Sequence, residues 1–290
     1  MEINNIFNCK RFGKYLVSDL TRCGANFGVS FIAITLAGVL AYLIAGAVSM
    51  ATGSGWYSSN ALIRTIYIGI SAVILICTMP AKCYGFITDK RAGANWLMLP
   101  VSTTEKFVSM LIITMIIIPA TFLAGVILLD WLIVALDPNL DTTIIGGMKE
   151  LFLLISEMAA QESEVNAFVM DKIANCKIFL TSSIDDIATW ILIFLLGALY
   201  FKKNKATKTV LTWIAVCIII SIFISPLMLA LSGNIDMETI NALGGGDIEA
   251  ATQIADNFIR KTIVFDVILD TILMVGAAVG IFFRIKTLKH

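Results

Sequence analysis

Residues 107–136 read FVSMLIITMIIIPATFLAGVILLDWLIVAL, an apolar run in which Asp130 is the only charged side chain. A helix needs roughly 20 apolar residues to cross about 30 Å of hydrocarbon, and this run exceeds that length. In lipid the run must be helical, because a helix satisfies its backbone polar groups within one segment. Pro119 removes one of those hydrogen bonds and predicts a kink. The stretch therefore predicts a membrane-spanning helix.

The same pattern recurs five times elsewhere in the chain. We predict the other spans at residues 27–50, 62–79, 184–201, 210–231 and 263–283. Apolar residues form 58% of the chain and charged residues 14%, whereas soluble domains have about 45–50% and 25%. The excess apolar surface is expected to face lipid. The sequence thus predicts an all-α integral membrane protein, with a six-transmembrane-helix bundle as the domain at residues 27–290.

Basic residues are distributed unequally between the two sides of this layout. Fifteen of the 21 lie on the side that holds both termini. They are Lys10, Arg11, Lys14, Arg22, Lys82, Lys90, Arg91, Lys106, Lys202, Lys203, Lys205, Lys208, Arg284, Lys286 and Lys289. Because basic loops stay in the cytoplasm, we expect a multi-pass protein of the plasma (inner) membrane with cytoplasmic N- and C-termini.

Residues 1–26 form a separate predicted unit. Phe7, Phe12, Tyr15, Leu16 and Leu20 fall mostly on one helical face, and the basic residues fall elsewhere. This pattern is typical of a helix that lies in the cytoplasmic membrane interface. A frayed tail is the alternative. A cleavable signal peptide is not expected, because the apolar region that follows is too long.

Two outer loops are long enough to contain helices. Apolar residues recur at helical spacing from Met148 to Ile155 and from Val165 to Ile173, within the long loop at residues 137–177. In the loop before the last span, Asp247 can cap a helix that follows the glycine run at residues 244–246. The sequence assigns no role to the loop at residues 137–177.

The chain lacks the motifs that most enzymes need. Its only histidine is the terminal His290, and its six cysteines include no Cys-x-x-Cys pair. The one Gly-Lys pair, Gly13-Lys14, lacks the glycine spacing of a phosphate-binding loop. We therefore expect no catalytic residues, no ATP site, no cofactor, no metal site and no nucleic-acid partner in this chain.

The loop between the second and third spans carries the most informative motif. It reads TDKRAGANWLMLPVSTTEK from Thr88 to Lys106. Its charged start, apolar middle and Pro100 predict a short helix that ends before a tight turn. Ser102 and Glu105 have the spacing of a capping box, in which each side chain bonds to the other residue's amide. The third span is therefore expected to start at Ser102 or Thr103, after a helix–turn–helix.

This loop resembles the coupling region of the permeases of type-2 ATP-binding-cassette (ABC) exporters. The resemblance rests on charged residues before Gly93, a Leu-Met-Leu run and Pro100-Val-Ser-x-Thr-Glu105 at the start of a span. At residue level it covers roughly Lys90 to Lys106, and the six-span layout also agrees. Two departures are the short stretch from Gly93 to Pro100 and the absence of an acid soon after the glycine.

The resemblance implies that this loop docks on a separate cytoplasmic ATPase subunit. The residues that it assigns to the coupling site are Asp89, Lys90, Arg91, Trp96, Leu97, Pro100, Ser102 and Glu105. It further implies pairing with a second permease, as a homo- or heterodimer, and ATP hydrolysis in the partner subunits.

Five acids lie in or near the outer halves of the predicted spans: Asp130, Asp185, Asp186, Asp266 and Asp270. Helix dipoles favour negative charge at the outer starts of the fourth and sixth spans. Asp270 lies about 10 Å below the start of its span at 1.5 Å per residue. A charge near mid-bilayer costs on the order of 3 kcal/mol unless it faces protein or water. A polar vestibule and helix-end electrostatics are therefore the two alternatives.

Together these features predict the membrane permease subunit of an ABC-type exporter, which forms the translocation path and couples to a separate ATPase. Two other functions stay open at this point. One is a non-transporting membrane accessory or scaffold protein. The other is a proton-coupled secondary transporter that uses the aspartates. A co-purifying ATPase would separate the first function from both alternatives.

Overall fold

The computed structural model describes residues 7–53, 60–136, 143, 145–146, 185–231 and 248–288. Within these ranges the chain is helical and contains no strand, which confirms the all-α prediction. The helices predicted in the loop at residues 137–177, the cap at Asp247 and the glycine run at residues 244–246 lie outside the described residues.

Five of the described helices are long and apolar enough to cross a membrane. Their candidate spans are Cys9–Ala51, Ile66–Thr88, Thr103–Leu136, Lys205–Phe223 and Val264–Thr287. Residues 185–200 form a further helix inside the predicted fourth span. The architecture is therefore that of a multi-pass helical membrane protein. A total of six spans stays a prediction, because the predicted fourth span at residues 184–201 is not among the five candidates.

The named elements follow one another along the chain with few long breaks. They are α1 (Cys9–Ala51), α2 (Asn60–Tyr84), the 3₁₀ turn η1 (Gly85–Thr88), α3 (Lys90–Leu97), α4 (Thr103–Leu111), the π-helical segment η2 (Ile112–Ile117), α5 (Ile118–Leu136), α8 (Lys205–Leu231) and α10 (Ile248–Thr287).

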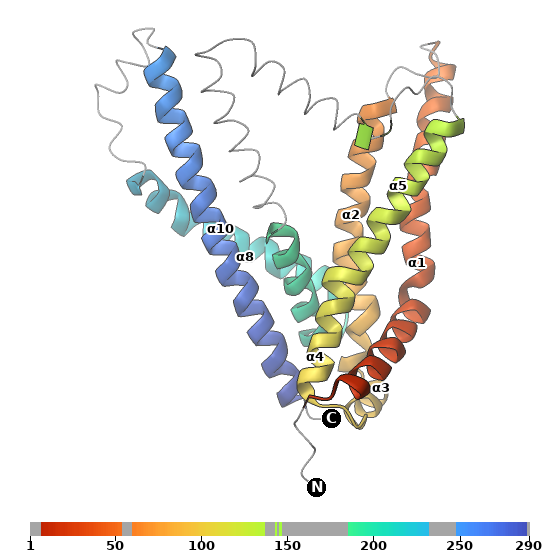
Figure 1. The fold of residues 1–290 in the computed structure, drawn as a ribbon. Coiled ribbons are helices and arrows are strands. Elements are labelled where there is room, and N and C mark those ends of the chain that lie inside the picture. Colours follow the sequence, from red (N-terminus) through yellow and green to blue (C-terminus); the bar gives the residue numbers. More distant parts are fainter. Residues whose placement is uncertain are drawn as a thin grey trace.

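In Figure 1, α1, α2 and α5 rise together on one side, whereas α10 diverges from them towards the top. The start of α1, the short helix α3 and the end of α10 all lie at the lower end. We call this the lower end of the bundle, and the opposite end its upper end. An even number of spans would leave the start of α1 and the end of α10 on the same side, as seen here.

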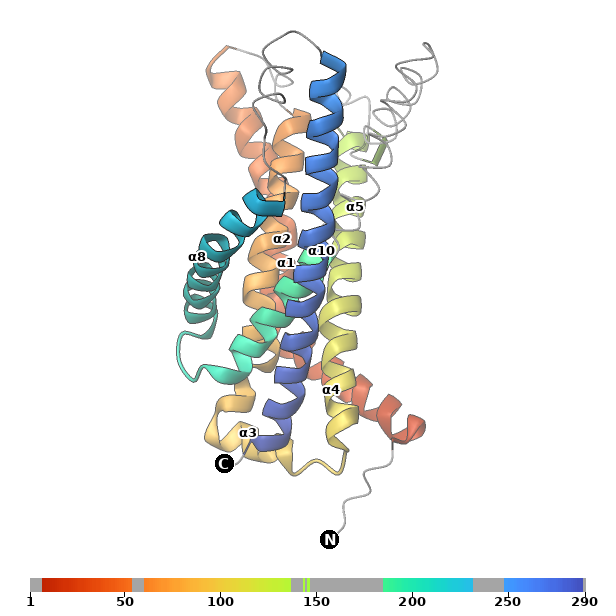
Figure 2. The ribbon, with the colours of Figure 1, turned by 90° about the vertical axis from the view of Figure 1, so that its left-hand side faces the viewer.

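Helix α1 joins two units that the sequence treats separately. Residues 9–51 form one helix without a break, although we expected an interfacial helix before residue 27 and a span after it. Figure 2 shows its first part crossing the lower end of the bundle at an angle to the rest. The side chain of Asn8 caps this helix by accepting hydrogen bonds from the amides of Lys10 and Arg11. The chain from Cys9 onward is therefore helical rather than frayed.

The buried apolar cluster lies where these helices meet. Its fully buried large side chains include Met79, Tyr84, Trp96, Met110, Ile113, Leu195 and Ile281. Many large apolar side chains face outward instead, such as Val29, Ile44 and Ile116. Such a surface would be unfavourable in water but suits a lipid environment.

The sequence predicts a kink at Pro119, and the structure has a different feature just before it, the π-helical segment η2 at Ile112–Ile117. The ring of Pro119 would clash with the carbonyl of Met115, four residues before it, and Pro119 has no amide to donate. Met115 lies within η2, and the wider π turn accommodates that lost hydrogen bond. The third candidate span therefore continues through the proline to Leu136.

Candidate functional site

Residues 89–105, which we call the hairpin, form a compact element at the lower end of the bundle. Helix α3 ends at Leu97, and α4 begins at Thr103. The capping box predicted from the sequence is present: the Ser102 hydroxyl accepts from the Glu105 amide at 3.2 Å, and the Ser102 amide donates to Glu105 Oε2 at 2.9 Å. The start of α4 is thus fixed by its own first turn.

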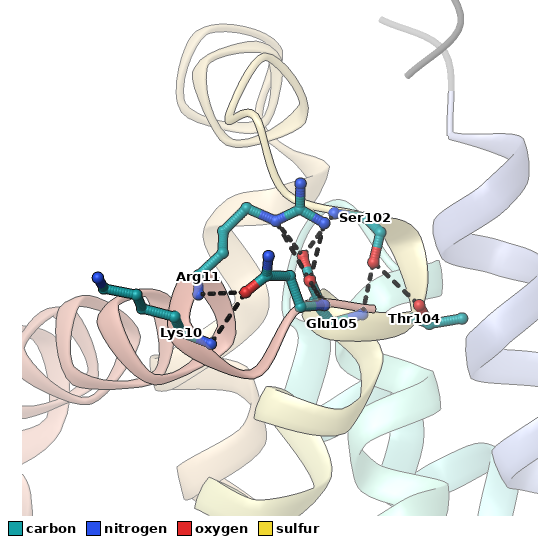
Figure 3. Close-up of polar contacts among 6 residues, drawn as sticks. Lys10, Arg11, Ser102, Thr104 and Glu105 are labelled. Carbon is teal, nitrogen blue, oxygen red and sulfur yellow. Dashed lines mark hydrogen bonds and ion pairs between the residues drawn. The ribbon is translucent and has the colours of Figure 1, made fainter. Parts of the chain in front are cut away.

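Glu105 also joins the hairpin to the start of α1, as Figure 3 shows. Its carboxylate accepts hydrogen bonds from Arg11 Nη2 at 2.8 Å and from Arg11 Nε at 2.9 Å. The Asn8 amide donates to the same carboxylate at 2.8 Å. Glu105 is fully buried, whereas the Arg11 side chain is 31% exposed. One carboxylate therefore holds the first turns of α1 and α4 together.

Trp96 forms a second contact between the hairpin and α1. It is 1% exposed, and its indole Nε1 donates to the Tyr15 hydroxyl of α1 at 3.0 Å. Lys106 donates to the carbonyls of Trp96 and Leu97 at 3.0 and 3.2 Å, and its ammonium lies 4.7 Å from the centre of the indole ring. These bonds reach carbonyls at the end of α3, of which that of Trp96 also accepts from the Leu99 amide at 3.4 Å.

Asp19 is a second buried carboxylate in this region. It accepts hydrogen bonds from the hydroxyls of Ser109 at 2.7 Å and Tyr84 at 3.1 Å, and it pairs with Arg22. These partners come from α1, α2 and α4. The bond to each charged oxygen is stronger than one between neutral groups, so Asp19 ties three helices together just above the hairpin.

Helix α8 reaches the hairpin through Lys205. Its ammonium bonds to the carbonyl of Gly85 and lies 3.7 Å from Asp89. Together, the contacts of Glu105, Trp96 and Lys205 connect the hairpin region to α1, α4 and α8. We call this set of contacts the basal junction.

Burial divides the residues that the sequence assigned to the coupling site. Asp89, Lys90, Arg91 and Pro100 are exposed, and Leu97 is half-buried. Trp96, Ser102 and Glu105 are buried inside the protein, so they can shape the hairpin but do not offer a surface to a partner. Met98, at 82% exposure, and Leu99, at 38%, form the exposed apolar turn; they belong to the Leu-Met-Leu run of the resemblance, but the sequence did not assign them to the coupling site.

A separate polar site lies towards the upper end, between α2 and α5. Arg64 Nη1 lies 2.8 Å from Asp130 Oδ1, and both side chains are less than 10% exposed. The pair borders a small pocket that Thr35, Tyr42 and Tyr67 also line. The sequence grouped Asp130 with the acids of a vestibule, but the structure gives it a basic partner 66 residues away.

Three of the other acids do come together. One carboxylate oxygen each from Asp186, Asp266 and Asp270 lies within 4.8 Å of the other two. Asp270 is buried, Asp186 half-buried and Asp266 exposed. Asp185 is half-buried on the same helix and is not a member of the group. Asp266 and Asp270 therefore lie on one face of their helix, as predicted, and Asp186 of the neighbouring helix lies beside them.

Sequence reasoning missed Arg11, Tyr15 and Asp19 as site residues. They recur every four residues along α1, and such residues lie on the same face of a helix. Tyr15 and Asp19 are buried, and Cys23 and Phe27 continue the buried stripe. On this face of α1, the polar residues before residue 20 are followed at the same spacing by apolar ones. This continuous pattern was the available signal that the face packs against protein.

Comparison of the chain with models of protein families gave no match, and comparisons with curated proteins and with solved structures gave none either.

Proposed function

We propose that this chain is the membrane permease subunit of an ABC-type exporter, with the hairpin as the element that couples it to a separate ATPase. The observation that carries the proposal is the construction of the hairpin. Its inner side is bonded to three helices through the basal junction, while its turn exposes the apolar side chains of Met98 and Leu99.

Coupling places two requirements on an element. First, a partner must be able to bind it; second, it must be attached to the spans so that its movement is transmitted to them. The hairpin meets the second requirement, because the hydrogen bonds of the buried Glu105 carboxylate fix its C-terminal end to the start of α1. Its turn meets the first, since Met is an adaptable contact residue. The exposed charges of Lys90 and Arg91 lie at the opposite end of α3 from the turn and would extend the polar part of a docking surface.

The finer features of the proposal follow from the sequence. Residues 185–200 would be the fourth of six spans, and residues 1–26 would lie at the cytoplasmic interface of the plasma (inner) membrane. Both termini would be cytoplasmic. The chain would pair with a second permease and with ATPase subunits that supply all ATP hydrolysis. This reading is supported by the excess of basic residues on the side of the hairpin.

The first prediction tests docking. Replacing both Met98 and Leu99 by aspartate should weaken binding of the ATPase by about 30-fold, the loss of roughly 2 kcal/mol that defines an interface hot spot. The exposed turn should tolerate the change, so the permease should remain folded and inserted. The measurement is the amount of ATPase that co-purifies from membranes, together with its stimulated hydrolysis.

Thr287→Asp is the matched control, because it adds a charge to an exposed residue at the end of α10, outside the hairpin. It should leave ATPase binding unchanged. If the double aspartate variant still binds the ATPase as well as the wild type does, the hairpin is not the docking element. A purified chain that never captures an ATPase would favour the scaffold, and proton-dependent uptake by the chain alone would favour a secondary transporter.

The second prediction tests orientation. In a background without native cysteines, Lys90→Cys on the hairpin should be protected from a membrane-impermeant thiol reagent in intact cells. Ala51→Cys, at the opposite end of α1, should react, because Ala51 is exposed and ends that helix. Both sites should react after the cells are opened. Labelling of Lys90→Cys from outside would overturn the proposed topology.

A further inference from the structure

Three carboxylates gather where the helix at residues 185–200 contacts α10. Each of Asp186, Asp266 and Asp270 places one oxygen within 4.8 Å of the other two. At this level the hydroxyl of Thr189 donates to the backbone carbonyl of Asp270 at 3.2 Å. Two helices that are far apart in sequence are therefore held in contact with their acids facing a common point.

Asp270 shows that this group is more than an acidic surface. The residue is 8% exposed, and its Oδ2 atom is buried without a hydrogen-bond partner among the described residues. A buried polar atom left unpaired is costly, and more so when it is charged. The permease function proposed above gives this oxygen no partner.

The charges of the three acids are also uncompensated within the described part of the chain. None of the ion pairs found there involves Asp186, Asp266 or Asp270. Carboxylates this close repel one another in a low-dielectric setting. Among the described residues, the oxygens of the group therefore converge on one point without a basic side chain that pairs with them.

We propose that Asp186, Asp266 and Asp270 bind one Ca²⁺ ion, which bridges the helix at residues 185–200 to α10. Ca²⁺ takes six to eight oxygen ligands at about 2.3–2.6 Å in flexible geometry, and one ion can contact oxygens that lie within 4.8 Å of one another. Mg²⁺ dehydrates reluctantly and is usually held by only one or two carboxylates, so three convergent carboxylates favour Ca²⁺. Asp266, two residues inside the start of the candidate span Val264–Thr287, would give the ion access from that end of the helix, and the buried Asp270 would anchor it.

This site does not depend on the permease proposal, and it is tested by binding alone. The full-length protein is purified in detergent, stripped with a chelator and equilibrated with radioactive Ca²⁺. We expect one Ca²⁺ per chain at millimolar or lower concentration. Bound Ca²⁺ should also raise the melting temperature, because a ligand that binds only the folded state stabilises it.

Single carboxylate substitutions then identify the ligands. Asp266→Asn and Asp270→Asn should each weaken Ca²⁺ binding by about tenfold or more, since affinity follows the number of charged ligands. Asp185→Asn removes the same charge from the neighbouring position and should weaken binding by less than about threefold, because it acts only at a distance. If Asp270→Asn does not fold, the exposed Asp266→Asn still gives the comparison.

Three results would overturn the site. The folded wild type could bind no Ca²⁺, in which case protons neutralise the acids. Asp185→Asn could weaken binding as much as Asp266→Asn does, which would mean a diffuse acidic surface. Mg²⁺ could bind as tightly as Ca²⁺, which would contradict the preference of three carboxylates for Ca²⁺.

Discussion

Replacing Asp130 by alanine should destabilise the folded protein by about 3–5 kcal/mol, the usual cost of removing one partner of a buried ion pair. Arg64 would keep its charge in a position where less than 10% of the side chain is exposed. The two residues lie in α2 and α5, and a charge left without its partner in a membrane helix is costly. The measurement is the free energy of unfolding, from a denaturing-detergent titration in mixed micelles.

Two controls test whether the loss of stability comes from the broken ion pair or from any substitution in α5. Thr121→Ala changes an exposed residue of the same helix and should alter stability by no more than about 0.5 kcal/mol. The double variant Arg64→Met, Asp130→Leu removes both charges together. It should recover most of the stability, because apolar replacements of a buried pair are often neutral. If the double variant is as unstable as Asp130→Ala, the pair is not the cause.

Replacing Glu105 by alanine should have the second-largest effect, a loss of about 2–4 kcal/mol, since hydrogen bonds to charged groups contribute about 1.5–3 kcal/mol each. The change leaves the amides of Asn8 and Ser102 and the guanidinium of Arg11 without their shared acceptor. We place the cost below the sum of these bonds, because Arg11 is 31% exposed and can turn to water.

The loss of stability in Glu105→Ala should also be confined to one region of the protein. Amide hydrogen exchange in the first two turns of α1 should accelerate, because the carboxylate is what ties them to α4, whereas the protection of α5 should persist. Lys10→Ala is the control: Lys10 is an exposed neighbour of Arg11, and its replacement should leave exchange unchanged. Unaltered protection of residues 9–15 in Glu105→Ala would show that the basal junction does not depend on this carboxylate.

The sequence was most informative where the physics is local. Apolar runs predicted the helices, because lipid leaves the backbone no other way to satisfy its polar groups. The capping box between Ser102 and Glu105 was predictable too, since both residues lie in one turn. The start of α4 at Thr103 and the change in the helix before Pro119 follow from the same short-range rules.

Boundaries between neighbouring helices were less predictable. The sequence separated residues 1–26 from the first span and the segment from Ile248 from the last one, yet α1 and α10 continue through both junctions. A change in polarity marks where a helix leaves lipid. It does not end the helix, because backbone hydrogen bonds continue as long as no residue breaks them.

By itself, the sequence determined that this is an all-helical, multi-pass membrane protein and that residues 102–105 start a helix, because composition and short-range spacing suffice for both. Only the tertiary structure decided the partners of the charged residues. Arg11 lies 94 residues from Glu105, and Arg64 lies 66 residues from Asp130. Nothing in their local sequence distinguishes such a pair from two separate charges, because the free energy of a buried charge depends on which groups the packed helices bring within a few ångströms of it.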